Sequence, residues 1–141
     1  MSERLIEQLK VHEGVEAFAY HCTANKLTIG VGRNIDKDGG LGLSEDEIDY
    51  LLKNDIYRCR KELSETFSWF DDLDEVRQDA IVNLHFNLGL TRLLGFKKAL
   101  AFMESGDYLL AAEEFLDSQW RNQVGNRAIE VTDMIRDGEY L

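Results

Sequence analysis

Three side chains near the start of the chain have types and spacing that suit hydrolytic chemistry. Glu13 stands directly before Gly14, Cys22 follows nine positions after the glutamate, and Thr28 lies six positions further on. A carboxylic acid can protonate a leaving oxygen, and a thiol or hydroxyl group can position or activate water. Glycoside hydrolysis needs such an acid together with a second group that guides water or acts as a nucleophile. These residues are therefore candidates for a hydrolytic site.

The segment before Glu13 predicts the helix that would position this acid. Apolar residues recur at spacings of three and four between residues 2 and 12, which is typical of an amphipathic helix. Gly14 is placed to end that helix, so Glu13 would lie at its C-terminus, where unpaired carbonyl groups disfavour a carboxylate. A Glu-Gly pair alone favours an ordinary surface acid, and the glycine-rich run that comes after it changes this interpretation.

A small antiparallel sheet is predicted directly after the first helix. Short extended segments are expected at 17–20, 26–31 and 33–35, because β-prone residues there lie between turn residues such as Asn25 and Gly32. The sheet would carry Thr28 and place Cys22 in its first connection.

Two motifs in this region resemble a known family, the T-even type bacteriophage lysozymes or endolysins. The motifs are His12-Glu13-Gly14 and the run Thr-Ile-Gly-Val-Gly-Arg-Asn that begins at Thr28. The resemblance covers nearly the whole chain. It implies a muramidase that cleaves the β-1,4 bond after N-acetylmuramic acid, with Glu13, Cys22 and Thr28 as catalytic residues. Cys22 departs from the usual pattern, since most members have an aspartate there.

The role of Cys22 has several interpretations. Its thiol can position water, act as a base, attack the sugar as a nucleophile, or take no part. We favour water positioning, because the thiolate of an ordinary cysteine is a minority species near neutral pH.

Further resemblance to the family lies in the second half of the chain. The segment 118–128 resembles a W-x-N-Q-x-x-N-R-A motif, in which Arg127 matches an arginine that approaches the catalytic glutamate from the opposite lobe. Phe86 and Asn87 match residues that line the saccharide cleft, so we expect Phe86, Asn87 and Arg127 to bind substrate. A core role for Phe86 and a turn role for Asn87 are about as plausible. Positions that are polar or basic in relatives differ here: Ala99, Glu114 and Gln119.

The remaining pattern predicts an α+β, lysozyme-like fold. Ser44 and Glu47 form a capping box at the start of a long helix that runs to residue 65. Further helices are expected at 73–88, 95–105 and 108–116. The resemblance implies a single domain over 1–141, with the sheet in an N-terminal lobe of about residues 1–60 and a helical C-terminal lobe of about 61–141. It also predicts an ion pair between Arg33 and Asp55.

Composition excludes several other functions. The 141 residues carry a formal net charge of −11, and there is no basic patch for phosphates, so we expect no nucleic-acid partner. No apolar run is long enough to span a membrane, and the three histidines and two cysteines lack metal-site spacing, so we expect no membrane association, metal or cofactor. Both cysteines are expected to be reduced, with Cys59 a small apolar residue on its helix.

The expected partner is bacterial peptidoglycan. The N-terminus lacks the pattern of a signal peptide, so we expect a monomer in the host bacterial cytoplasm that needs a separate holin to reach the cell wall. The alternative function is a non-catalytic carbohydrate-binding or interaction module with the same fold. The presence of Glu13, Thr28 and Arg127 together favours the enzyme.

Overall fold

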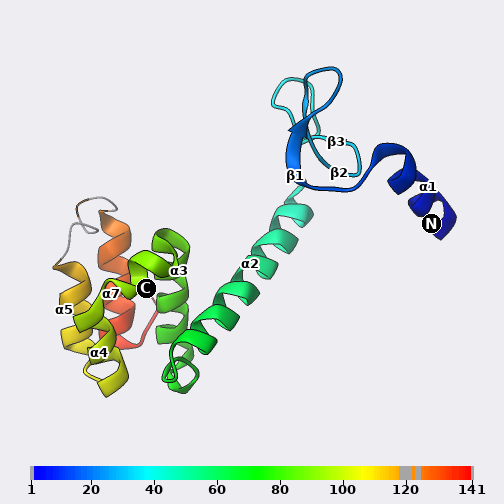
Figure 1. The fold of residues 1–141 in the computed structure, drawn as a ribbon. Helices are drawn as coiled ribbons and strands as arrows, with labels where there is room; N and C mark the ends of the chain where they lie inside the picture. Colours follow the sequence, from blue (N-terminus) through cyan, green and yellow to red (C-terminus); the bar gives the residue numbers. More distant parts are fainter. Residues whose placement is uncertain (1, 118–121, 123–124, 141) are drawn as a thin grey trace. The chain divides into compact units, whose positions relative to one another are not determined.

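The computed structural model describes residues 2–117, 122 and 125–140. A three-stranded antiparallel sheet lies near the N-terminus, and helices make up most of the described chain after it, which confirms the predicted α+β class (Figure 1). The contacts between residues divide the chain into two compact units, 1–52 and 53–141. This division falls within a long helix, earlier than the lobe boundary expected near residue 60.

Helix α1 spans Glu3–Glu13 and ends at the predicted glycine. The Ser2 hydroxyl accepts a hydrogen bond from the Leu5 N–H at 3.4 Å and caps its first turn. At the other end Gly14 has φ of +80°, and its N–H donates to the Lys10 carbonyl at 3.0 Å. A residue with a side chain is disfavoured at this φ, so glycine fixes Glu13 as the last helical residue.

The sheet has the order β1-β2-β3, with strands Glu16–His21, Leu27–Gly30 and Arg33–Asn34. Thr28 lies in the central strand and pairs with a residue of each neighbouring strand. The first connection contains Asn25 at φ of +60°, a left-handed conformation that asparagine tolerates better than most residues. The sheet therefore forms where the sequence predicted it, with Thr28 at its centre.

Asp36 fastens the loop after β3 to the sheet. Its carboxylate accepts hydrogen bonds from the backbone N–H groups of Leu27 at 3.0 Å and Asp38 at 2.9 Å. These two N–H groups, with a smaller contribution from the charge of Lys26, hold the pKa of Asp36 below its usual range. The loop thus fixes the start of β2, next to Thr28.

Helix α2 spans Glu45–Thr66 and begins with the predicted capping box. The Ser44 N–H donates to Glu47 Oε1 at 2.9 Å, and the Glu47 N–H donates to Ser44 Oγ at 3.3 Å. Two backbone N–H groups at the helix start are thereby satisfied, one by each side chain of the pair.

The predicted ion pair between Arg33 and Asp55 is wrong. The Arg33 guanidinium binds Glu47 instead, with Nη1 at 2.9 Å from Oε1 and Nη2 at 2.8 Å from Oε2. Asp55 pairs with Arg58, one turn further along α2. The capping box holds the Glu47 carboxylate in place at the helix start, where it satisfies Arg33.

The second unit contains the remaining helices, α3 (Glu75–Leu94), α4 (Lys97–Ser105), α5 (Tyr108–Leu116) and α7 (Asn126–Asp137). Helix α5 packs against both α4 and α7, and α3 packs against α7 (Figure 1). Their apolar faces meet in a core whose most completely buried side chains include Leu63, Ile81, Leu84, Leu93, Met103, Phe115 and Ile135. The helices expected at 95–105 and 108–116 are confirmed to within a few residues.

Helix α3 consists of two helical stretches that meet at Gly89. The first stretch ends at Leu88, the predicted helix end, and the second continues to Leu94. Gly89 has φ of +76° and ψ of 165°, a non-helical conformation that glycine adopts without a steric penalty, so the helix is kinked at this residue.

Arg77 connects three helices of the second unit. Its Nε donates to the Ile135 carbonyl at 2.7 Å and its Nη2 to the Arg136 carbonyl at 3.1 Å, so it caps the last turn of α7. The same guanidinium lies 3.9 Å from the centre of the Tyr108 ring at the start of α5. A Cβ at Gly138 would lie only 2.9 Å from Arg77 Nη1, so this glycine leaves room for the arginine.

Tyr140 is fastened to α3 by its hydroxyl group. The hydroxyl donates a hydrogen bond to the Asp79 carboxylate, which also pairs with Arg60 of α2. The bond to Asp79 is the main reason that the pKa of Tyr140 rises to about 12.

Candidate active site

Glu13 lies at the end of α1 with its side chain against Gly32, in the turn between β2 and β3. A Cβ built on Gly32 would lie 2.7 Å from Glu13 Oε2 and 3.1 Å from its Cδ. Gly32 also has φ of +63°, so both the backbone conformation and the nearby carboxyl group favour glycine. The absence of a side chain at Gly32, in the turn between β2 and β3, therefore leaves space for the Glu13 carboxyl group at the end of α1.

Cys22 lies in the tight connection between β1 and β2. Its N–H donates to the Lys26 carbonyl at 2.9 Å, and its carbonyl accepts from the Asn25 N–H at 2.8 Å. The Thr28 hydroxyl donates to the same Lys26 carbonyl at 2.8 Å, and Thr28 is only 3% exposed. The connection thus brings Cys22 and Thr28 to one carbonyl group.

The surroundings of Cys22 favour its thiolate. The backbone N–H groups of Lys26 and Ala24 hold the pKa of the Cys22 thiol below its ordinary value, and the Thr28 hydroxyl contributes in the same direction, against a smaller opposing effect of desolvation. The hydroxyl has one proton, which it can give either to the Lys26 carbonyl or to the sulfur. The backbone N–H groups are therefore the main stabilising contacts.

Together these residues provide an acid and a thiol of lowered pKa within the unit of residues 1–52. The Cys22 N–H and the Thr28 hydroxyl bind the same Lys26 carbonyl, and Glu13 lies against Gly32 in the turn between β2 and β3. The acid can donate a proton, while the thiolate can accept one or attack an electrophilic carbon.

The predicted substrate-binding residues lie in the other unit, 53–141. Phe86 and Asn87 lie on α3, and Asn83 occupies the same face one turn earlier. Arg127, in the first turn of α7, binds Asn83 through Nε at 2.9 Å from Oδ1 and Nη2 at 3.3 Å from the backbone carbonyl. This contact brings Arg127 to the face that carries Phe86, whereas an approach of Arg127 to Glu13 stays a prediction.

Phe86 does not behave as a core residue. It is 42% exposed, while its helical neighbours Leu84 and Leu88 are buried. Its side chain is therefore partly open to solvent. Much of the segment 118–128, including Gln119 and Trp120, lies outside the described residues.

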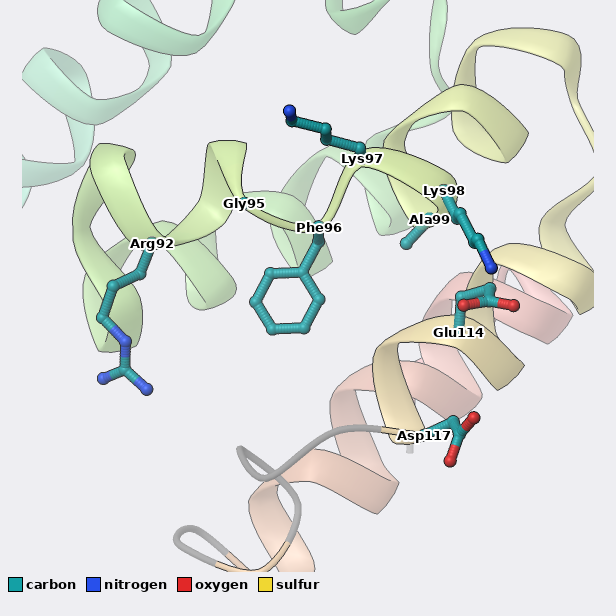
Figure 2. Close-up of a pocket in the computed structure, with 8 residues that line it drawn as sticks. All are labelled: Arg92, Gly95, Phe96, Lys97, Lys98, Ala99, Glu114 and Asp117. Carbon is teal, nitrogen blue, oxygen red and sulfur yellow. The ribbon is translucent and has the colours of Figure 1, made fainter.

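A pocket of about 580 Å³ lies where α3, α4 and α5 meet, and it carries charges of both signs. Figure 2 shows the Phe96 ring in the pocket, with the Lys98 and Glu114 side chains pointing toward one another. Its lining residues are Arg92, Gly95, Phe96, Lys97, Lys98, Ala99, Glu114 and Asp117. Ala99 and Glu114, two positions where the family resemblance led us to expect polar or basic residues, therefore share one pocket.

Sequence reasoning did not identify the basic side of this pocket, although a signal was present. Lys97 and Lys98 are the first two residues of α4. Positive charge is disfavoured at a helix N-terminus, because the unpaired N–H groups there are partly positive. Two adjacent lysines at that position suggest a role other than stabilising the helix.

The described residues include no group of three or more His, Cys, Asp or Glu side chains arranged to bind a metal ion. Cys22 and Cys59 are both free thiols. No helix within 2–117 or 125–140 is both long enough and apolar enough to cross a membrane.

Comparison with protein families matches residues 10–134 to the phage lysozyme family. The chain belongs to this family. The match confirms the family resemblance found in the sequence, and every predicted site residue of this phage lysozyme family member lies within the matched span.

Individual relatives agree with this family assignment. Two proteins of Dictyostelium discoideum, named probable T4-type lysozyme 1 and probable T4-type lysozyme 2, are each 27% identical over 164 aligned positions, covering 98% of this chain and 96% of their own length. An endolysin of Acyrthosiphon pisum secondary endosymbiont phage 1 is 28% identical over 116 positions, covering 82% of this chain and 77% of its own length.

The surroundings of Cys22 lead to a prediction about its acidity. In a Cys59→Ser variant, where Cys22 is the remaining thiol, the pKa of Cys22 should lie below the ordinary value of a cysteine thiol. Thr28→Val should raise the pKa of Cys22 but leave it below the ordinary value, because the backbone N–H groups remain. The rate of alkylation by iodoacetamide, measured against pH, gives both values. A Cys22 pKa at or above the ordinary value would contradict this account.

Proposed function

We propose that the chain is an endolysin-type muramidase, which hydrolyses the β-1,4 bond between N-acetylmuramic acid and N-acetylglucosamine in bacterial peptidoglycan. The observation that carries the proposal is the packing of the Glu13 carboxyl group against Gly32, on the sheet that also holds Cys22 and Thr28. Membership of the phage lysozyme family supports the substrate class.

Glu13 acts as the general acid. It protonates the glycosidic oxygen as the bond to the sugar breaks, so that the departing group leaves as an alcohol. The transition state has positive charge on the sugar ring, which a nearby anion stabilises.

The Cys22 thiolate takes the place of the second carboxylate. Backbone N–H groups increase its population near neutral pH, so it can both stabilise the positive sugar and accept a proton from the attacking water. The Thr28 hydroxyl orients that water. The lowered pKa makes a base role for Cys22 more favourable than the sequence alone indicated.

Residues of the second unit bind the substrate. The Phe86 ring offers an apolar surface to a sugar, and Asn87 and Arg127 offer polar groups. The pocket around Lys98 and Glu114 has both charges needed to bind amino and carboxylate groups attached to the glycan. We propose that residues 1–141 act as one lysozyme-like domain. The protein would work as a monomer, released from the host cytoplasm by a separate holin.

The acid role is tested with Glu13→Gln. Glutamine matches the shape of glutamate but cannot donate the proton, so lysis should fall by a hundredfold or more, on the order expected for a general acid. Loss of turbidity of chloroform-treated bacterial cells measures the activity, and circular dichroism checks the fold. A variant within about tenfold of the parent would exclude this role. A parent that binds peptidoglycan without lysing cells would instead support the non-catalytic alternative.

The thiol role is tested by replacing Cys22. Cys22→Asp should stay active, because a carboxylate serves as base and anion without needing a perturbed pKa. Cys22→Ala should lose most activity, since it removes the proton acceptor. Equal activity of Cys22→Ala and the parent in the same turbidity assay would show that the thiol takes no part. An inactive Cys22→Asp beside an active parent would favour nucleophilic attack by sulfur.

The space for Glu13 is tested by two glycine substitutions. Gly32→Ala would place a Cβ 2.7 Å from the Glu13 carboxyl oxygen, whereas a Cβ on Gly30 meets no atom within 4 Å. Both glycines have positive φ, at +63° and +70°, so both variants carry backbone strain. Gly32→Ala should therefore lose far more lytic activity than Gly30→Ala at matched stability. Equal losses would mean that the contact with Gly32 does not position the acid.

A further inference from the structure

Cys59, His85 and Glu62 form a hydrogen-bonded chain in the second unit. The Cys59 Sγ lies 3.2 Å from His85 Nδ1, and His85 Nε2 lies 3.0 Å from Glu62 Oε1. Cys59 and Glu62 lie one turn apart on α2, and His85 lies on α3. The imidazole therefore contacts a thiol through one nitrogen and a carboxylate through the other.

The three hydrogen-bonded side chains line a pocket of about 380 Å³. The residues that line this pocket are Asp55, Arg58, Cys59, Glu62, His85 and Phe86. The His85 side chain is 13% exposed and that of Glu62 is 47% exposed, so the carboxylate reaches solvent while the imidazole is mostly covered. Cys59 is half-buried and lines the pocket, so a small molecule in the pocket lies next to its side chain.

We propose that Cys59 is a base-assisted nucleophile that exchanges with small disulfides in this pocket. The order of groups is that of a nucleophile, a general base and a residue that orients the base. His85 is placed to take the thiol proton through Nδ1. The Glu62 carboxylate accepts a hydrogen bond from Nε2–H, which fixes the ring and stabilises the imidazolium that forms.

Disulfide exchange suits this site better than acyl transfer. Cleaving an amide or ester needs N–H donors for the oxyanion of the tetrahedral intermediate. Cys59 lies in the interior of α2, Glu45–Thr66, where backbone N–H groups are used in helical hydrogen bonds. Exchange at sulfur develops negative charge only on sulfur atoms, so it needs no such donors.

The exchange balances without any further reactant. His85 removes the Cys59 proton as the sulfur attacks one sulfur of the disulfide. A bond forms between Cys59 and that sulfur, and the original disulfide bond breaks. The departing thiolate then takes the proton from His85. The products are a mixed disulfide on Cys59 and one molecule of free thiol.

Burial and the charges around the pocket disfavour the Cys59 thiolate, so any acceleration of exchange by His85 can be measured against a slow background. Burial is the largest cause that raises the pKa of the Cys59 thiol, and the carboxylates of Glu62 and Asp55 raise it further, against a smaller opposing effect of Arg58. Without a base, thiolate is scarce at neutral pH and exchange is slow. With His85 as base, exchange proceeds at pH values where the unassisted thiolate is scarce.

The test uses the full chain with Cys22→Ser, so that Cys59 is the remaining thiol, and cystamine as the disulfide. Intact mass measures the mixed disulfide over time at several pH values. The rate should rise less steeply with pH than the tenfold per pH unit that unassisted thiolate chemistry gives below the thiol pKa. Addition of His85→Gln should slow exchange about tenfold or more at neutral pH and restore the steep rise.

Two further variants keep the outcome clear if His85→Gln does not fold. Glu62→Gln removes the orienting carboxylate and should also slow the reaction, while Glu65→Gln removes the same charge elsewhere on α2 and should not. Equal rates and equal pH profiles for the starting protein and Glu62→Gln would overturn the proposal, as would a steep profile in the starting protein. The assay measures no lysis, so it is independent of the proposed muramidase function.

Discussion

The candidate active site depends on the backbone of Lys26. Its carbonyl accepts hydrogen bonds from the Cys22 N–H and the Thr28 hydroxyl, and its own N–H stabilises the Cys22 sulfur. One peptide residue thus fixes the thiol, the hydroxyl and the connection that joins β1 to β2. Asp36 supports this arrangement from the other side by binding the N–H of Leu27. The chemistry of Cys22 therefore arises from backbone geometry rather than from a neighbouring charged side chain.

The two units achieve their order in different ways. The unit 1–52 relies on hydrogen bonds of turns and caps, such as those of Asp36 and Ser44, around a small sheet. The unit 53–141 has a continuous apolar core and uses Arg77 to tie three helices at one end of it. The proposed catalytic groups lie in the first, where loops position them, and the proposed binding groups lie on helices of the second.

Local features of the fold could be predicted from the sequence. The capping box of Ser44 and Glu47, the helix stop at Gly14 and the turn at Asn25 all depend on residues within a few positions of one another. The family motif identified the residues of the candidate site, but their geometry required the structure. The lowered pKa of Cys22, for example, depends on the N–H groups of a turn whose conformation sequence alone does not fix.

Features that depend on distant residues could not be predicted in the same way. Arg33 binds Glu47 rather than Asp55, because the capping box determines which carboxylate is nearby. Cys59 meets His85 across 26 positions of sequence, so a residue interpreted as a small apolar side chain has a polar partner. Helix α7 was not predicted, although its buried positions, among them Val131 and Ile135, have helical spacing.

Hydrogen bonds made by Tyr140 and by the last turn of α7 limit how the protein can be joined to other molecules. Tyr140 binds Asp79, and the last turn of α7 gives two carbonyl groups to Arg77. A purification tag or fusion partner attached after these residues needs a flexible linker that leaves the Tyr140 ring in place. A linker that replaced the tyrosine would remove the hydrogen bond to Asp79 and leave the Asp79 carboxylate paired with Arg60. An exposed position such as Leu109 on α5 offers a site for attaching a label that leaves the Tyr140–Asp79 hydrogen bond intact.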